Sequence, residues 1–111
     1  MATSTGDVPI RSKLVDEDPS YADLIQAYIH ALQERVESLH EAIESQDLDR
    51  VRALAHQLKG SGGGHGYPIL TAVAGGLEAH AVDRSIDQCR KALDELAAII
   101  PRIVAGAPSA S

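Results

Sequence analysis

The sequence contains no tryptophan and no phenylalanine, and tyrosine occurs only three times in 111 residues. Its hydrophobic share is nevertheless 44%, which is typical of a globular chain rather than a disordered one. The core is therefore expected to be aliphatic, built mostly from Leu, Ile, Val and Ala. A chain of this length is sufficient for one domain with its own core.

A single cysteine, Cys89, excludes an intrachain disulfide and fits a reducing compartment. No apolar run approaches the roughly 20 residues that are needed to span a bilayer. The first residues, MATSTGDVPIRSK, lack the apolar core of a signal peptide. We therefore expect a cytoplasmic protein that does not act at a membrane.

Basic residues are scarce, because 10 Lys and Arg stand against 16 Asp and Glu, for a formal net charge of −6. This balance argues against nucleic-acid binding, which requires a basic stripe, and against adsorption to an anionic membrane surface. Acidic residues are themselves absent from Arg50 to Leu77, whereas Arg52 and Lys59 are present there. This interval surrounds His56, so the sequence predicts a histidine that is kept apart from carboxylates.

No segment alternates apolar and polar residues with a period of two, so no sheet is predicted. Apolar residues instead recur at steps of three and four in four segments. The first begins at Asp18-Pro19 and continues to about residue 45. We interpret it as one long helix that could bend near Ala31, with two abutting helices as the alternative. The second follows a cap at Asp47 and continues to Gly62 or slightly beyond.

The third segment restarts at Pro68, a residue that suits the first position of a helix. The fourth opens with Ser85 and Gln88 in the spacing of a capping box. Pro101 lies late in this segment and is expected to bend or end the helix, because proline cannot donate a backbone hydrogen bond.

Four amphipathic segments with short connections predict an all-α, antiparallel up-down four-helix bundle. We assign the bundle to residues 9–105. It includes a short N-terminal arm or helical turn that contains Ile10, Leu14 and Val15. Residues 1–8 and 106–111 are expected to be disordered tails.

The stretch VRALAHQLKGSGGGHG, residues 51–66, separates into two faces when it is projected as a helix. One face is apolar and contains Val51, Leu54 and Leu58. The opposite face contains Arg52, His56, Lys59, Gly60 and Gly63, which lie close together in this projection. Each glycine in this run costs a helix roughly 1 kcal/mol relative to alanine. Such a cost suggests that another group must approach the backbone closely.

The longer stretch AHQLKGSGGGHGYPILTAVAGGLE, residues 55–78, resembles the signature of histidine-containing phosphotransfer (HPt) domains. In this resemblance His56 matches the phosphoacceptor, Lys59 the lysine beside it, and Gly60 the small residue one turn on. A downstream element is matched by Ala74, Leu77 and Glu78. The resemblance implies a four-helix bundle, in agreement with the periodicity.

An imidazole is a nucleophile near neutral pH, since its unperturbed pKa is about 6.5. His56 is thus the predicted phosphoacceptor, and Lys59, about one turn away, is the predicted charge partner of the phosphoryl group. We expect the surrounding face to contact the partner through Arg52, Gln57, Gly60, Gly63, Gly64 and His65.

No acidic residue lies near His56 in sequence to hold a metal ion for phosphoryl transfer, although helix packing could bring Glu78 closer. The five histidines are scattered without an H-x3-H pair, which argues against zinc. A phosphate loop is excluded because Lys59 precedes the glycines rather than following them. We therefore predict a phosphoryl carrier that is not itself an enzyme and binds no metal or other cofactor.

The resemblance implies that a response-regulator receiver domain supplies the acceptor aspartate and Mg²⁺, and that a hybrid sensor histidine kinase is the donor. The monomeric chain would then relay phosphate from aspartate to His56 to aspartate. One alternative remains open, namely a binding module that docks a receiver or another signalling protein through the same face without relaying phosphate.

Overall fold

The computed structural model describes residues 8–109, and within that range every regular element is a helix. This confirms the predicted all-α fold. The outer residues of the two expected tails, 1–7 and 110–111, lie outside the described part. The elements in chain order are α1 (Lys13–Glu17), the 3₁₀ turn η2 (Pro19–Tyr21), α2 (Ala22–Glu44), α3 (Leu48–Gly64), α4 (Pro68–Val82) and α5 (Ile86–Ala105).

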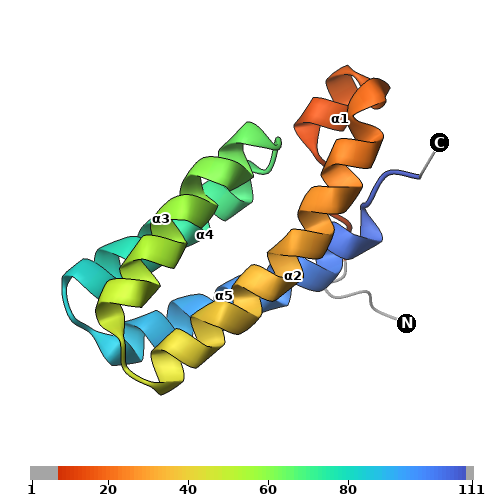
Figure 1. The fold of residues 1–111 in the computed structure, drawn as a ribbon. Coiled ribbons are helices and arrows are strands. Elements are labelled where there is room, and N and C mark those ends of the chain that lie inside the picture. The colour runs from red at the N-terminus through yellow and green to blue at the C-terminus, as the bar shows by residue number, and fades with distance from the viewer. Residues whose placement is uncertain (1–7, 110–111) are drawn as a thin grey trace.

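The four long helices form a bundle in which α2 and α4 each pack against both α3 and α5 (Figure 1). The short connections make successive helices antiparallel, as predicted. The core is aliphatic, and its fully buried side chains include Ile25, Leu32, Leu39, Val51, Leu58, Leu70, Leu77, Leu96 and Ile103. Among the described residues, no helix has both the length and the apolar composition that a membrane span requires.

The predicted starts of the second and third long helices are confirmed. Asp47 accepts a hydrogen bond from the backbone N–H of Arg50 at 3.1 Å and so caps α3. Pro68 is the first residue of α4. Asp18 caps the turn η2 through the N–H of Ser20 at 3.0 Å. The first long helix, α2, then continues without interruption to Glu44, so the option of two abutting helices is wrong.

For the last helix, the predicted capping box is wrong, and of the two outcomes predicted for Pro101 the end of the helix is excluded. Ser85 is its N-cap residue, but the side chain makes no capping hydrogen bond, so the capping box does not form. The backbone carbonyl of Ser85 instead accepts from the N–H of Cys89 at 3.0 Å. The helix does not end at Pro101, because buried Ile100 and Ile103 hold its last turn against the core.

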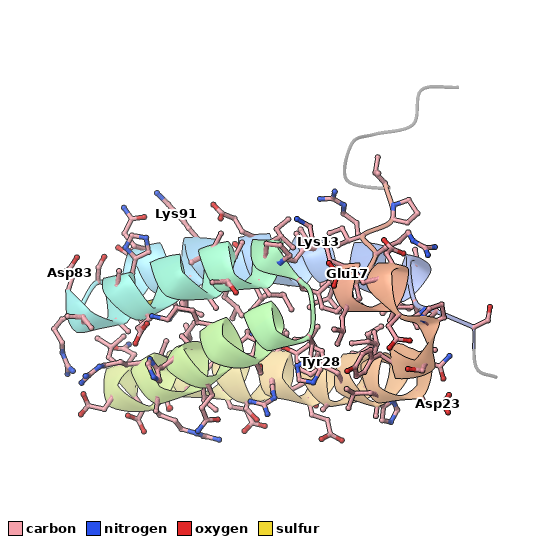
Figure 2. All side chains as sticks on the ribbon, turned by 90° about the horizontal axis from the view of Figure 1, so that it is seen from above. Lys13, Glu17, Asp23, Tyr28, Asp83 and Lys91 are labelled. Atoms are coloured by element: carbon pink, nitrogen blue, oxygen red, sulfur yellow. The ribbon has the colours of Figure 1, made fainter. Side chains whose placement is uncertain are left out.

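The N-terminal arm closes the end of the bundle where α3 connects to α4. The hydroxyl of buried Ser12 donates to the carbonyl of His65 at 2.7 Å, and the N–H of Lys13 donates to the carbonyl of Gly66 at 2.9 Å. In Figure 2, Tyr28 lies near this end beside α1, whereas Asp83 marks the opposite end. At the C-terminal side, Gln26 Nε2 donates to the carbonyl of Pro108 at 2.5 Å.

Candidate functional site

His56 lies on the outer surface of α3, where its side chain is 67% exposed. Helix α4 runs beside α3 and places Glu78 next to the histidine. The carboxylate atom Glu78 Oε2 lies 2.8 Å from His56 Nδ1, and Oε1 lies 2.8 Å from Lys59 Nζ. One carboxylate thus bridges the imidazole and the ammonium group. The apolar face of α3 positions this cluster, because Val51 and Leu58 are fully buried on the opposite side.

The contact with Glu78 determines which nitrogen of His56 carries the proton. An ionised carboxylate only accepts hydrogen bonds, so Nδ1 must be the donor. In a neutral imidazole the other nitrogen, Nε2, then has a free lone pair. Hydrogen bonds from Lys59 and then from His56 lower the pKa of Glu78 below its ordinary value. The carboxylate is therefore ionised at neutral pH, which keeps the acceptor in place.

The expectation that carboxylates stay away from His56 is wrong. It rested on the interval from Arg50 to Leu77, and Glu78 is the first acidic residue after that interval. The antiparallel packing of α3 on α4 brings Glu78 back to His56. Its match to the downstream element of the HPt signature was the signal in the sequence, but its contact with His56 depends on helix packing that the sequence does not display.

The glycines of α3 fall into two pairs with different surroundings. A Cβ atom on Gly62 would lie 2.6 Å from Leu70 Cβ, and one on Gly63 would lie 2.9 Å from Thr71 Oγ1. These two glycines allow α4 to approach α3 closely. A Cβ atom on Gly60 or Gly64 would meet no atom within 4 Å. The open part of the predicted glycine face therefore consists of Gly60 and Gly64, whereas Gly63 also serves the packing of the two helices.

Arg52 and Gln57 are both exposed on α3. Arg52 lies one turn before His56 and borders a surface hollow of about 300 Å³, which is also lined by Asp49, Ala53, His56 and Glu78. The structure thus brings Arg52 and His56 together at one recess. Gln57, the residue after His56, makes no side-chain hydrogen bond within the described part of the chain.

His65, the last residue expected at the partner face, is half-buried and makes its contacts inside the molecule. Its ring stacks on Tyr28 with a centroid distance of 3.9 Å and an interplanar angle of 7°. Its Nδ1 lies 2.7 Å from the carbonyl of Ser61. The hydroxyl groups of Tyr28 and Ser61 are 2.9 Å apart. His65 therefore belongs to a packed group at the end of α3 and does not approach His56 and Glu78.

Metal ligation requires several donor side chains that converge on one point. Among residues 8–109 there is no group of three or more His, Cys, Asp or Glu side chains that could hold a metal ion. At the site itself, the two groups within hydrogen-bond distance of Glu78 are His56 and Lys59.

A comparison with protein-family models matches the chain to the Hpt domain over residues 23–106. This match covers α2 to α5 and includes all three residues of the bridged cluster. No curated protein and no solved structure gives a significant match.

Proposed function

The chain belongs to the Hpt domain family, and we propose that His56 carries a phosphoryl group between receiver-domain aspartates in a multistep phosphorelay. Hpt domains are phosphocarrier modules of two-component signalling, and receiver domains are partners of this class. In the proposal a hybrid sensor histidine kinase supplies the phosphoryl group and a response regulator accepts it. The chain acts as a cytoplasmic monomer.

The contact of 2.8 Å between His56 Nδ1 and Glu78 is the observation that carries the proposal. With the proton held on Nδ1, the Nε2 lone pair attacks the phosphorus of an aspartyl phosphate on the receiver. A P–N bond forms, the P–O bond breaks, and the aspartate leaves as a carboxylate. The ring becomes positively charged, because Nδ1 keeps its proton. Glu78 stabilises that charge, much as a carboxylate orients and stabilises the histidine of a catalytic triad.

The same arrangement favours the return step. When a second receiver aspartate attacks the phosphorus, the P–N bond breaks and its electron pair returns to Nε2. The ring then leaves as a neutral imidazole, provided that Nδ1 is still protonated. A carboxylate beside this histidine is therefore useful in both directions. Its negative charge lies on the Nδ1 side of the ring, and the phosphoryl group is attached at the opposite nitrogen.

Lys59 compensates the charge that arrives with the phosphoryl group. Its ammonium group has three donors, and Glu78 Oε1 occupies one of them in the unphosphorylated site. A second donor is therefore available to a phosphoryl oxygen, and a hydrogen bond between charged groups is stronger than a neutral one. The side chain is 39% exposed, so it has room to turn toward His56.

The remaining parts of the reaction come from the receiver. We propose that the receiver contributes the aspartate and the Mg²⁺ that stabilises the transferring phosphoryl group. We propose that it contacts the surface formed by Arg52, Gln57, Gly60 and Gly64. The exposed backbone of Gly63 adjoins this surface and belongs to the same contact. The open backbone at Gly60 and Gly64 lets the loops of the receiver approach His56 without steric hindrance.

The test compares two histidine substitutions in the full chain. His56→Gln retains an amide donor for Glu78 and should abolish the acid-labile, base-stable label that a phosphorylated receiver transfers. His65→Gln is the matched control and should still be labelled in its folded fraction, measured by autoradiography after normalisation by circular dichroism. Labelling of the His56→Gln variant would refute the assignment of His56. A receiver that binds the wild-type chain without exchanging phosphate would favour the alternative of a docking module.

A further inference from the structure

The seam between α3 and α4 has a regular antiparallel register on both sides of His56. Gly63 is opposite Thr71, Lys59 is opposite Gly75, and His56 is opposite Glu78. At the far end of the seam, Arg84 Nη1 donates to Asp49 Oδ1 at 3.0 Å. The residues of α3 from Gly63 back to Asp49 therefore face, in order, the residues from Thr71 forward to Arg84.

The two halves of this seam differ in what they present to a partner. On the Gly63 side, the exposed positions Gly60 and Gly64 carry no side chain. At these two positions a partner meets backbone and not a side chain that would distinguish one receiver from another. This half provides access to His56 but little basis for selecting a partner.

The Asp49 side presents side chains of several kinds. The hollow of about 300 Å³ has Asp49, Arg52 and Ala53 on its α3 wall. Continuing the register of the seam one turn beyond His56 and Glu78, we infer that Val82 lies opposite Arg52. Val82 is 56% exposed, which is more than any other large hydrophobic residue of the described part. Its neighbour Asp83, labelled in Figure 2, marks this end of the bundle.

The charges on this side are unevenly paired. Asp49 is compensated by Arg84, whereas Arg52 forms no ion pair within residues 8–109. A guanidinium group without an ion pair, next to the exposed side chains of Ala53 and Val82, is complementary to a partner that presents a carboxylate beside an apolar side chain. Charge complementarity of this kind mainly controls the rate of association and the choice of partner.

We propose that the Asp49 side of the seam selects the cognate receiver, with Arg52 and Val82 as its specificity-determining residues. The inference rests on the proposed relay function. The receiver it describes has an acidic residue that pairs with Arg52 and an adjacent apolar side chain that packs against Val82 and Ala53. The ion pair between Asp49 and Arg84 offsets part of the negative charge that Asp49 would present to that acidic residue.

The experiment is a phosphotransfer profile of the full chain against the phosphorylated receiver domains of its source organism. Arg52→Glu is compared with Arg50→Glu, which makes the same charge change at an exposed position on another side of α3. We expect Arg52→Glu to slow transfer from the preferred receiver at least tenfold, whereas Arg50→Glu stays within about twofold of wild type. Val82→Asp should also slow that transfer, because it removes the apolar contact.

Charge reversal on the receiver provides the second arm. One acidic surface residue of the preferred receiver, replaced by lysine, should restore transfer to the Arg52→Glu chain while impairing transfer to the wild-type chain. Equal effects of Arg50→Glu and Arg52→Glu, or the absence of any such compensating receiver residue, would overturn the inference. If no receiver labels the wild-type chain at His56, the proposed relay function itself fails, which is a different result.

Discussion

His56 lies on α3 and His65 directly follows that helix, within the same stretch of residues 51–66, yet their surroundings differ. Each has Nδ1 within hydrogen-bond distance of an oxygen. For His56 that oxygen belongs to a carboxylate, and the ring is largely exposed. For His65 it is the backbone carbonyl of Ser61, and the face of the ring is covered by Tyr28. The two histidines thus differ in their tertiary contacts, which their positions in the sequence do not reveal.

The comparison extends to what each end contributes to the protein. Around His56 the ion pairs are at the surface, where such pairs contribute little to the free energy of unfolding. Around His65 the contacts join α3 to α2 and to the N-terminal arm through Tyr28, Ser12 and Gly66. Substitutions near His56 should therefore alter phosphotransfer, whereas substitutions near His65 should alter stability.

Gly66→Ala should have the largest effect on stability. Gly66 has φ +84°, and an added Cβ would lie 2.6 Å from the backbone nitrogen of Leu14. The left-handed conformation costs an alanine about 1–2 kcal/mol, and the overlap adds a similar amount. We expect a loss of about 3 kcal/mol in the free energy of unfolding, measured by urea denaturation.

The matched control for this prediction is Gly60→Ala. Its Cβ would meet no atom within 4 Å, and the residue lies inside α3. Alanine is a better helix former, so this variant should gain up to about 1 kcal/mol. If Gly66→Ala were as stable as the wild type, the N-terminal arm would not be fastened to the α3–α4 connection as described.

Glu78→Gln should reduce phosphotransfer without a comparable loss of stability. A neutral amide no longer requires His56 to carry its proton on Nδ1, and it cannot stabilise the positive ring that forms on phosphorylation. Removing the carboxylate partner of a metal-binding histidine typically costs 10- to 100-fold in affinity or activity, and we expect a reduction of about that size in the transfer rate here. Rapid-quench measurement with a phosphorylated receiver gives this rate. A wild-type rate in this variant would mean that Glu78 does not control the tautomer of His56.

Much of the fold could be predicted from the sequence, because amphipathic helices leave a periodic signal. The spacing of apolar residues located all four long helices, and Asp47 and Pro68 marked two of their starts correctly. The errors arose where a local rule competed with packing. Pro101 does not end α5, since the buried residues around it keep the last turn in place.

The site was predictable only in part, because its residues come from two helices. His56 and Lys59 share one face of α3, and helical projection alone identifies that face. Glu78 enters the site through the register of α4 on α3, which depends on the close approach at Gly62 and Gly63. The glycine run indicated that another group packs closely against the backbone of α3. The sequence pattern does not reveal whether that group belongs to a neighbouring helix or to a partner protein.

Tyr28→Phe tests the packed end with a smaller expected effect. The substitution removes the hydrogen bond of 2.9 Å between the hydroxyl groups of Tyr28 and Ser61 but keeps the ring that stacks on His65. A loss of about 1 kcal/mol in the free energy of unfolding is expected for one such bond. Phosphotransfer to His56 should be unchanged when it is normalised to folded protein.

Tyr67→Phe is the paired control, because burial raises the pKa of Tyr67 to about 12 and its hydroxyl has no hydrogen-bond partner within the described residues. Removing that hydroxyl should not destabilise the chain. Equal losses for the two variants would show that the bond between Tyr28 and Ser61 contributes nothing of its own to the packed end.

The ionisation of Glu78 is expected to have the smallest effect on the free energy of unfolding. It tests the surroundings of His56 without involving those of His65. Lys59 and His56 lower the pKa of Glu78 below its ordinary value of 4.5. A depressed carboxyl pKa stabilises the folded state above the unfolded pKa, and this contribution is lost as the pH falls through the folded pKa. The stability advantage of the wild type over Glu78→Gln should therefore shrink as the pH falls below about 5. Carbon-13 NMR of the Glu78 carboxyl group gives the titration directly, and Lys59→Ala should return its midpoint toward 4.5, because Lys59 is the largest cause of the shift.

His65→Gln should leave the midpoint unchanged, since His65 makes no contact with Glu78. A midpoint of 4.5 in the wild-type chain would contradict the bridged cluster of His56, Glu78 and Lys59 in solution.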